Sequence, residues 1–201
     1  EKRFIIALSG GSTPKKLFKL LAAEPYKSQI DWARVHIFWG DERFVPFSDE
    51  RNNARMAYEE LLNHVPVKKE NIHVMRTELE PSAAVADYEK ILHQYFENQP
   101  YTFDLVMLGL GDNAHTLSLF PGYEVIHVTH QWVYAFFLKE QNMYRITLTA
   151  PVVNQAAKVI YLVSGADKAP ALKEILEGKQ NFDLYPAQVI QPILDEPYWF
   201  L

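Results

Sequence analysis

The chain has 201 residues, 48% of them hydrophobic and 22% charged, with a formal net charge of −5. This composition is typical of a globular domain with a sizeable core. The weakly acidic balance argues against nucleic acid or an anionic membrane as the main partner. Cysteine is absent, which excludes disulfides, thiol catalysis and thiolate metal sites. No apolar stretch approaches the roughly 18 residues of a membrane span, and we expect a cytoplasmic protein.

A glycine-rich loop follows the first predicted strand, residues 3–8. Gly10 and Gly11 permit a tight turn, and Ser12 or Thr13 can cap a helix over 14–23. That helix is expected to bury Leu17, Leu20 and Leu21. Free N–H groups at the start of a helix favour an anion, and the loop is well shaped for a phosphate. An ordinary strand-to-helix turn is the alternative, and a nucleotide P-loop is excluded because the Gly-x4-Gly-Lys-Ser/Thr spacing is absent.

Strands and helices alternate along the rest of the chain. This alternation predicts an α/β fold in which a doubly wound, mainly parallel sheet is flanked by helices, as one domain over residues 1–201. Ligands of such folds bind beyond the carboxyl ends of the strands. Because the chain begins at Glu1 rather than Met, we also expect that an N-terminal piece is missing. Strands are predicted over 35–39, 72–75, 103–108, 132–138, 144–149 and 158–164, helices over 53–62, 82–96 and 168–176, and a short strand within the tail from 185.

The segment Trp39–Pro46 follows the second strand and carries two carboxylates and an arginine. Arg43 is predicted to contact an anion, since guanidinium binds phosphate in a fork geometry. Asp41 would then be a polar or acid/base group near the substrate. A solvated loop with an internal ion pair is the alternative. Asn52-Asn53 is interpreted most simply as the cap of the next helix, with a ligand role as the second interpretation.

A second glycine loop, Gly109–Thr116, follows the strand over 103–108. Gly109, Gly111 and Ala114 match a dinucleotide fingerprint, but Pro121-Gly122 soon ends any helix and no acidic residue lies about 20 positions on to hold a ribose. We therefore reject that function. The loop places His115 in a polar setting beyond a strand end, which favours a general base over a purely structural histidine.

Two more cations lie near strand ends. Alternation along residues 144–149 puts Arg145 on the same face as Thr147 and Thr149, as an edge charge or a ligand contact. Lys168 lies at the start of a predicted helix, where the helix dipole disfavours a cation. A phosphate shared with the first glycine loop would resolve that conflict, whereas an ordinary surface lysine is the alternative.

Taken in order, these segments closely resemble the 6-phosphogluconolactonase family. The matching blocks span nearly the whole chain, and each is modest alone while the ordered set is specific. The resemblance implies hydrolysis of 6-phospho-D-glucono-1,5-lactone to 6-phosphogluconate in the oxidative pentose phosphate pathway, without a metal or organic cofactor. It also implies an additional helical stretch before the first glycine loop. The blocks are Leu8–Pro14, Trp39–Pro46, Leu108–Gly122, Arg145–Pro151 and Gly165–Ala169.

The resemblance also implies roles for individual residues. A phosphorylated sugar lactone would be held at its phosphate by four residues of the first glycine loop, and His115 would be the general base that activates water against the lactone carbonyl, with Asp41 beside it. Three cations would surround the phosphate and substrate. The loop residues are Gly10, Gly11, Ser12 and Thr13, and the cations are Arg43, Arg145 and Lys168.

The chain departs from the family in the loop before His115. The family pattern is Gly-x-Asp-Gly-His-Thr, whereas Asn113 and Ala114 stand here in place of the aspartate and the second glycine. An aspartate could orient the imidazole and stabilise its charged form, while an asparagine can only orient it. Asp112 is a candidate to compensate, and otherwise the base is weaker.

Two other functions compete with the lactonase. The glucosamine-6-phosphate deaminases resemble this chain in the phosphate loop and at Asp41, His115 and Lys168, but they follow the histidine with Asn-Glu-Pro, where this chain has Leu119-Phe120-Pro121. The second alternative is a non-catalytic sugar-phosphate sensor of the kind that occurs in bacterial regulators. Such a module normally carries a DNA-binding segment, and the visible sequence shows none.

Overall fold

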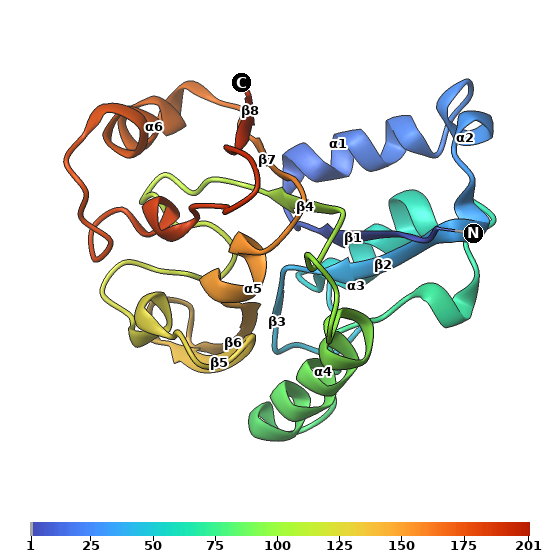
Figure 1. Cartoon of the computed structure of the whole chain (residues 1–201), viewed down its shortest axis with the longest axis horizontal. Helices are drawn as coiled ribbons and strands as arrows, with labels where there is room; N and C mark the ends of the chain where they lie inside the picture. Colours follow the sequence, from blue (N-terminus) through green and yellow to red (C-terminus); the bar gives the residue numbers. More distant parts are fainter. Residues whose placement is uncertain (1) are drawn as a thin grey trace.

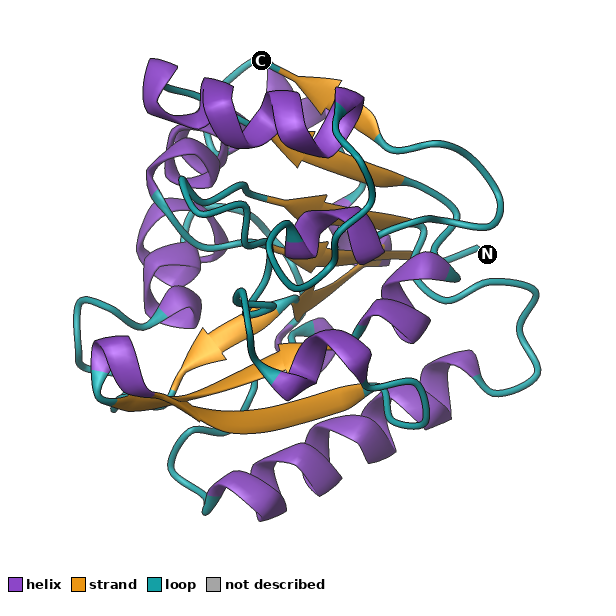
Figure 2. Ribbon diagram, turned by 90° about the vertical axis from the view of Figure 1, so that its left-hand side faces the viewer, coloured by secondary structure: helices purple, strands orange, loops and turns teal. Residues whose placement is uncertain are grey.

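The computed structural model describes residues 2–201 and contains two β-sheets surrounded by helices (Figures 1 and 2). The strands are β1 (Phe4–Leu8), β2 (Val35–Trp39), β3 (Asp41–Arg43), β4 (Leu105–Leu108), β5 (Val133–Leu138), β6 (Met143–Leu148), β7 (Val159–Leu162) and β8 (Tyr198–Phe200). The helices are α1 (Ser12–Leu21), α2 (Tyr26–Gln29), α3 (Asn53–Ala57), α4 (Pro81–Phe96), α5 (Ala150–Asn154) and α6 (Ala169–Glu177). A π-helical turn at Tyr58–Leu62 extends α3.

The larger sheet has the order β2-β1-β4-β7-β8, and all of its neighbouring strands are parallel. This confirms the predicted α/β class with a mainly parallel sheet. Helices connect the strands, so the carboxyl ends of β1, β2, β4 and β7 lie at one edge. Leu8 is paired with Trp39 at the end of β1 and β2, which brings the loops after both strands together.

The smaller sheet is antiparallel and has the order β3-β6-β5. The sequence predicts β5 and β6 as consecutive strands, but it does not predict that they leave the main sheet. β3 was interpreted as a loop, because three polar residues carry no hydrophobic alternation. In the structure Arg43 pairs with Arg145 across β3 and β6, and Gly40 joins the small sheet directly to β2. The small sheet therefore places Asp41 and Arg145 beside the edge of the main sheet.

Both faces of the main sheet are covered, which explains the continuous apolar runs of its strands. Along β1, Ile5 and Ala7 belong to the core that also holds α4 and the small sheet, whereas Leu8 belongs to the core beneath α1 and α3. Figure 1 shows α4 on the side of β5 and β6, and α1 across the sheet from it. Two cores thus hold the strand ends rigidly at one edge.

Several predicted elements differ in detail. Neither Ser12 nor Thr13 caps α1, because Gly11 occupies the cap position and no side chain bonds there. Phe18 is the buried anchor of α1, whereas Leu20 is 49% exposed, so its predicted burial was wrong. The predicted strand over 72–75 is reduced to one bridge between Ile37 and Ile72. The predicted helix over 168–176 is α6, preceded by a 3₁₀ turn at Ala166–Lys168.

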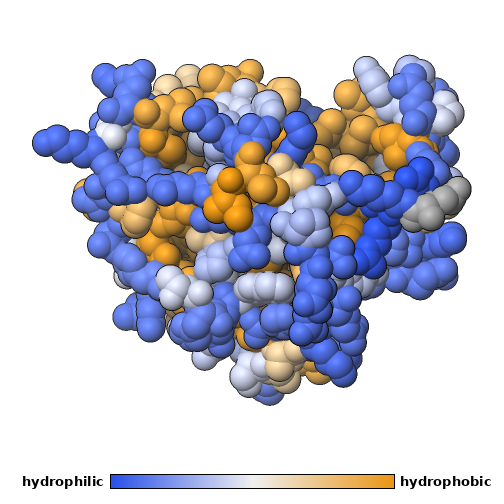
Figure 3. Space-filling view, viewed as in Figure 1, coloured by the Kyte–Doolittle hydropathy of each residue, from blue (hydrophilic) through white to orange (hydrophobic). Residues whose placement is uncertain are grey.

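Hydrophilic residues and smaller apolar patches share the face drawn in Figure 3. Among residues 2–201, no helix has both the length and the apolar character needed to cross a bilayer.

Candidate active site

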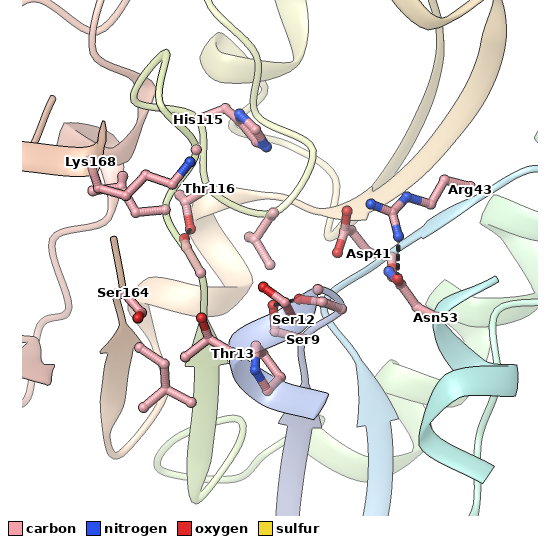
Figure 4. Close-up of a pocket in the computed structure, with 18 of the residues that line it drawn as sticks. Ser9, Ser12, Thr13, Asp41, Arg43, Asn53, His115, Thr116, Ser164 and Lys168 are labelled. Atoms are coloured by element: carbon pink, nitrogen blue, oxygen red, sulfur yellow. Dashed lines mark hydrogen bonds between the residues drawn. The ribbon is translucent and has the colours of Figure 1, made fainter. Parts of the chain in front are cut away.

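The loops after β1, β4 and β7 and residues of strands β3 and β6 meet in one pocket at the carboxyl edge of the main sheet (Figure 4). Its volume is about 250 Å³. The pocket brings together every site residue that the sequence predicts, from segments that are up to 158 positions apart when Gly10 and Lys168 are compared (168 − 10). The predicted residues that line it are Gly10, Gly11, Ser12, Thr13, Asp41, Arg43, His115, Arg145 and Lys168.

The first glycine loop presents free donors to this pocket. Gly11 has a φ of 103°, a conformation that favours glycine, and it starts α1 without a side-chain cap. The backbone N–H groups of residues 10–13 find no acceptor within the described part of the chain, and the first backbone bond of the helix runs from Lys15 N to Gly11 O. These donors lie at the positive end of the α1 dipole, as an anion site requires.

Asn53 holds the glycine loop and Arg43 together. Its side-chain nitrogen donates to Asp41 O at 3.0 Å, and its Oδ1 accepts from Arg43 Nη1 at 2.5 Å (dashed in Figure 4). A Cβ built on Gly10 would lie 1.9 Å from Asn53 Oδ1, so a larger residue there would displace the Asn53 side chain or the loop. Arg43 also donates to Arg51 O but forms no ion pair within residues 2–201.

Asp41 and Arg145 form a buried ion pair at the floor of the pocket. Asp41 Oδ2 accepts from Arg145 Nη2 at 2.7 Å, and the two side chains are 7% and 3% exposed. Ser118 Oγ donates to the same Asp41 oxygen and accepts from Arg145 Nε. Burial opposes ionisation of Asp41, but Arg145, Arg43 and Ser118 together hold the pKa of that carboxyl below its usual range. The charge of Arg145 is therefore compensated within the protein.

The imidazole of His115 is fixed on three sides. Asn113 Oδ1 lies 2.5 Å from Nδ1 and also accepts from the His115 backbone N–H. Phe120 stacks on the ring with centroids 4.2 Å apart. A Cβ on Gly111 would lie 2.0 Å from Nδ1, so that glycine makes room for the ring. Since an amide oxygen only accepts, Nδ1 carries the proton and Nε2 keeps its lone pair.

Nε2 of His115 has no hydrogen-bond partner among residues 2–201, and Figure 4 shows the ring directed into the pocket. Burial lowers the pKa of His115 to about 4. The Asp41 carboxylate opposes this shift, while Arg145 and Lys168 add to it. The ring is therefore neutral at physiological pH and can accept a proton.

Asp112 does not contact this imidazole. Its carboxylate accepts from the Asn113 backbone N–H, and the ring bonds to Asn113 instead. Ala114, at the position of the family's second glycine, has a φ of 63° and is buried. The loop therefore keeps a left-handed backbone even without glycine, at a cost of roughly 1–2 kcal/mol.

Lys168 lies across the glycine loop from Arg43. It occupies the cap position of α6, and its Nζ contacts the exposed carboxylate of Asp167 at 2.9 Å. Asp167 therefore offsets part of the conflict between Lys168 and the helix dipole. Figure 4 shows Lys168 on the same side of the pocket as His115, whereas Asp41 and Arg43 lie on the other.

Sequence analysis missed two supporting residues of the site. Ser118 and Phe120 were not singled out as site residues, because a serine and a phenylalanine in a loop carry no pattern of their own. Of the predicted capping pair Asn52-Asn53, Asn52 is the cap, with Oδ1 accepting from Arg55 N, and Asn53 lines the pocket. In the part of the chain that the structure describes, no cluster of three or more histidine or carboxylate side chains is arranged to hold a metal ion.

The chain is similar to known proteins in sequence and in fold. The family model described as glucosamine-6-phosphate isomerases/6-phosphogluconolactonase matches residues 1–199. A 6-phosphogluconolactonase of Nostoc sp. is 41% identical, and the match covers 100% of this chain and 82% of that protein. The crystal structure of the devB protein superposes with a TM-score of 0.91 at 35% identity, over 98% of this chain and 84% of the other. The 6-phosphogluconolactonase of Thermotoga maritima has a TM-score of 0.85 at 26% identity, over 99% and 85%.

The chain therefore belongs to the family of glucosamine-6-phosphate isomerases and 6-phosphogluconolactonases, a family of α/β enzymes. Within that family, the relatives from Nostoc sp. and Thermotoga maritima are 6-phosphogluconolactonases, which are hydrolases.

Proposed function

We propose that this chain hydrolyses 6-phospho-D-glucono-1,5-lactone to 6-phospho-D-gluconate, with His115 as the general base. The observation that carries the proposal is that a neutral imidazole with a free Nε2 faces the same small pocket as the unpaired N–H groups of the first glycine loop. One end of the pocket suits a phosphate, and the other suits the reacting carbon of the substrate.

The phosphate is held by the N–H groups of Gly10 and Gly11 and by the hydroxyls of Ser12 and Thr13. Arg43 and Lys168 lie on opposite sides of the pocket. Both supply positive charge, because neither is neutralised by a buried carboxylate. Arg145 lines the same pocket but has its charge compensated by Asp41, so it contributes hydrogen bonds and rigidity more than net charge.

The chemical step is an ester hydrolysis. Nε2 of His115 takes a proton from water as the water oxygen attacks the lactone carbonyl carbon, giving a tetrahedral oxyanion. Collapse of this intermediate breaks the bond between the carbonyl carbon and the ring oxygen, and the imidazolium returns its proton to that oxygen. Asn113 keeps Nδ1 protonated throughout, so that the lone pair stays on the side of the substrate.

A deaminase is disfavoured by the environment of the imidazole. At the position where the resemblance implies a carboxylate for that reaction, this chain has Phe120, whose ring covers one face of His115. An apolar ring carries no proton that it could accept or donate. The site therefore lacks the second acid/base group that the deaminase reaction needs.

The deciding experiment compares two substrates. Purified protein is mixed with freshly prepared phosphogluconolactone and, separately, with glucosamine 6-phosphate, and acid release and ammonia release are followed. The proposal expects acid release well above the spontaneous rate and no ammonia. Ammonia release would establish the deaminase, and binding of both sugars without turnover would establish the sensor.

A further inference from the structure

Glu42 is an ionisable side chain that the proposed reaction does not use. Side chains alternate along β3, so Asp41 and Arg43 face the pocket while Glu42 points the other way, toward α3. Only 1% of Glu42 is exposed. A carboxylate at such depth carries a desolvation penalty of several kcal/mol, and its position therefore calls for a specific reason.

The carboxylate accepts three hydrogen bonds from backbone N–H groups. Oε1 accepts from the N–H groups of Arg43 and Asn53, and Oε2 accepts from Ala54, each at 2.8 Å. Two of these donors belong to the first turn of α3, and the third belongs to the strand that carries Arg43. One side chain thus joins β3 to the start of α3.

Helix capping alone does not explain this arrangement. Asn52 already caps α3 through its bond from Arg55 N. A neutral acceptor at Glu42 would suffice for a second cap, without the penalty of a buried charge. The distinctive bond of Glu42 is the one to Arg43 N, which fixes a pocket residue directly.

A second bond continues from the same helix back to the pocket. Asn53, held at its N–H by Glu42, accepts from the Arg43 guanidinium through Oδ1. Glu42 therefore holds Arg43 at two points: directly at its backbone N–H, and through Asn53 at its guanidinium. The same Asn53 oxygen also lies next to Gly10, so the position of Asn53 affects the glycine loop as well as Arg43.

We propose that Glu42 is a positioning residue that fixes the Arg43 guanidinium at the phosphate end of the pocket, through the backbone of Arg43 and through Asn53. This inference rests on the proposed phosphate site. Glu42 itself touches no substrate, and its effect is on affinity for the phosphorylated ligand.

The test is the binding of 6-phosphogluconate, with gluconate as the unphosphorylated reference, measured by calorimetry at pH 8. Burial raises the pKa of Glu42 to about 7, so its carboxylate is mostly ionised at that pH. Glutamine has one side-chain oxygen where glutamate has two, so in Glu42→Gln the amide NH2 must face a backbone N–H of β3 or α3 and displace it. Glu42→Gln should therefore weaken 6-phosphogluconate binding at least tenfold and leave gluconate binding unchanged. Asn52→Ala is the matched control, because it removes the other cap of α3 and should lower stability without changing the dissociation constant.

A double-mutant cycle with Arg43→Ala separates positioning from general damage. In the Arg43→Ala background, Glu42→Gln should have no further effect on binding, because the group that it positions is gone. An equal loss in both backgrounds would overturn the proposal. If Glu42→Gln does not fold, Asn53→Ala breaks the next link, and it should show the same loss and the same dependence on Arg43.

The outcomes also distinguish this inference from the proposed function. Failure of the unmodified protein to bind 6-phosphogluconate at all would overturn the phosphate site itself. Tight binding that Glu42→Gln and Asn53→Ala leave unchanged would overturn only the role of Glu42.

Discussion

Asp41 Oδ2 lies 2.7 Å from Arg145 Nη2, in a pair that is almost completely shielded from water. The two residues come from β3 and β6, neighbouring strands of the small sheet, and Ser118 completes the network from the loop after His115. Through Ser118, the pair connects the small sheet to the loop that carries His115. Loss of this pair would leave a buried charge without its partner where Asp41 and Arg145 line the pocket.

Replacement of one partner should be costly for stability. Asp41→Asn leaves a buried guanidinium uncompensated, and we expect the free energy of unfolding to fall by about 3 kcal/mol. Urea denaturation followed by fluorescence measures this change. Asp49→Asn is the control, because Asp49 pairs with Arg51 at the same 2.7 Å on the surface and should lose less than about 1 kcal/mol. Similar losses at the two positions would contradict the special role of the buried pair.

Removal of the imidazole should abolish the chemical step and spare binding. His115→Ala is expected to reduce kcat about 100-fold or more, because the carboxylate that lines the pocket with it, Asp41, is already paired with Arg145. The dissociation constant of 6-phosphogluconate should change less than threefold. His127→Ala serves as the control, since His127 does not line the pocket and pairs with the exposed Asp183. Near-normal turnover of His115→Ala would refute the base assignment.

The pH dependence should reflect the lowered pKa of His115. A base must be neutral to act, and a pKa of about 4 keeps the imidazole neutral throughout the range from pH 5 to 7.5. In Asn113→Asp the carboxylate beside Nδ1 stabilises the imidazolium, so the acid limb of kcat/KM should move to higher pH. Both enzymes use the same substrate, so ionisation of its phosphate cancels in the difference between their profiles. Superimposable acid limbs would show that Asn113 does not set the charge of the ring.

Lys168 should matter for the phosphate and not for the sugar. Lys168→Ala is expected to raise KM for the phosphorylated lactone about tenfold, with little change for gluconolactone. Steady-state kinetics with the two lactones provides the comparison. Lys15→Ala is the control, since Lys15 lies on α1 near the loop but pairs with Glu60 at 3.0 Å. Equal losses for both lactones in Lys168→Ala would remove phosphate as the reason for this lysine.

The contact between Gly10 and Asn53 gives a test at the glycine loop. In Gly10→Ala the new methyl group would overlap Asn53 Oδ1, so either the loop moves or the Asn53 side chain moves and weakens its bond to Arg43. We expect at least tenfold weaker binding of 6-phosphogluconate. In Gly109→Ala the nearest atom is Ser9 Oγ at 3.8 Å, and binding should be nearly unchanged. Tolerance of Gly10→Ala would mean that this close approach is not needed.

The parallel sheet and most of its strands could be predicted because their apolar runs are local. Most of the predicted pocket residues also followed from position, since they come just after a predicted strand or at the start of a helix, whereas Arg145 followed from the alternation along a strand. The cap and the buried face of α1 were harder to predict, as Ser12 and Leu20 show, because both depend on the angle at which α1 lies on the sheet. The strand predicted over 72–75 was too long, since the structure has a single bridge there between Ile37 and Ile72.

By itself, the sequence determined the α/β class, the glycine loop and the candidate base, because strand periodicity and turn chemistry depend on neighbouring residues. Only the tertiary structure decided how charges are shared. In the structure Asp41 pairs with Arg145, and Glu42 points away from the pocket. Asn113 and Phe120 contact the ring of His115. These partners are separated by up to 104 positions (145 − 41), and no local pattern specifies which carboxylate a distant arginine will meet.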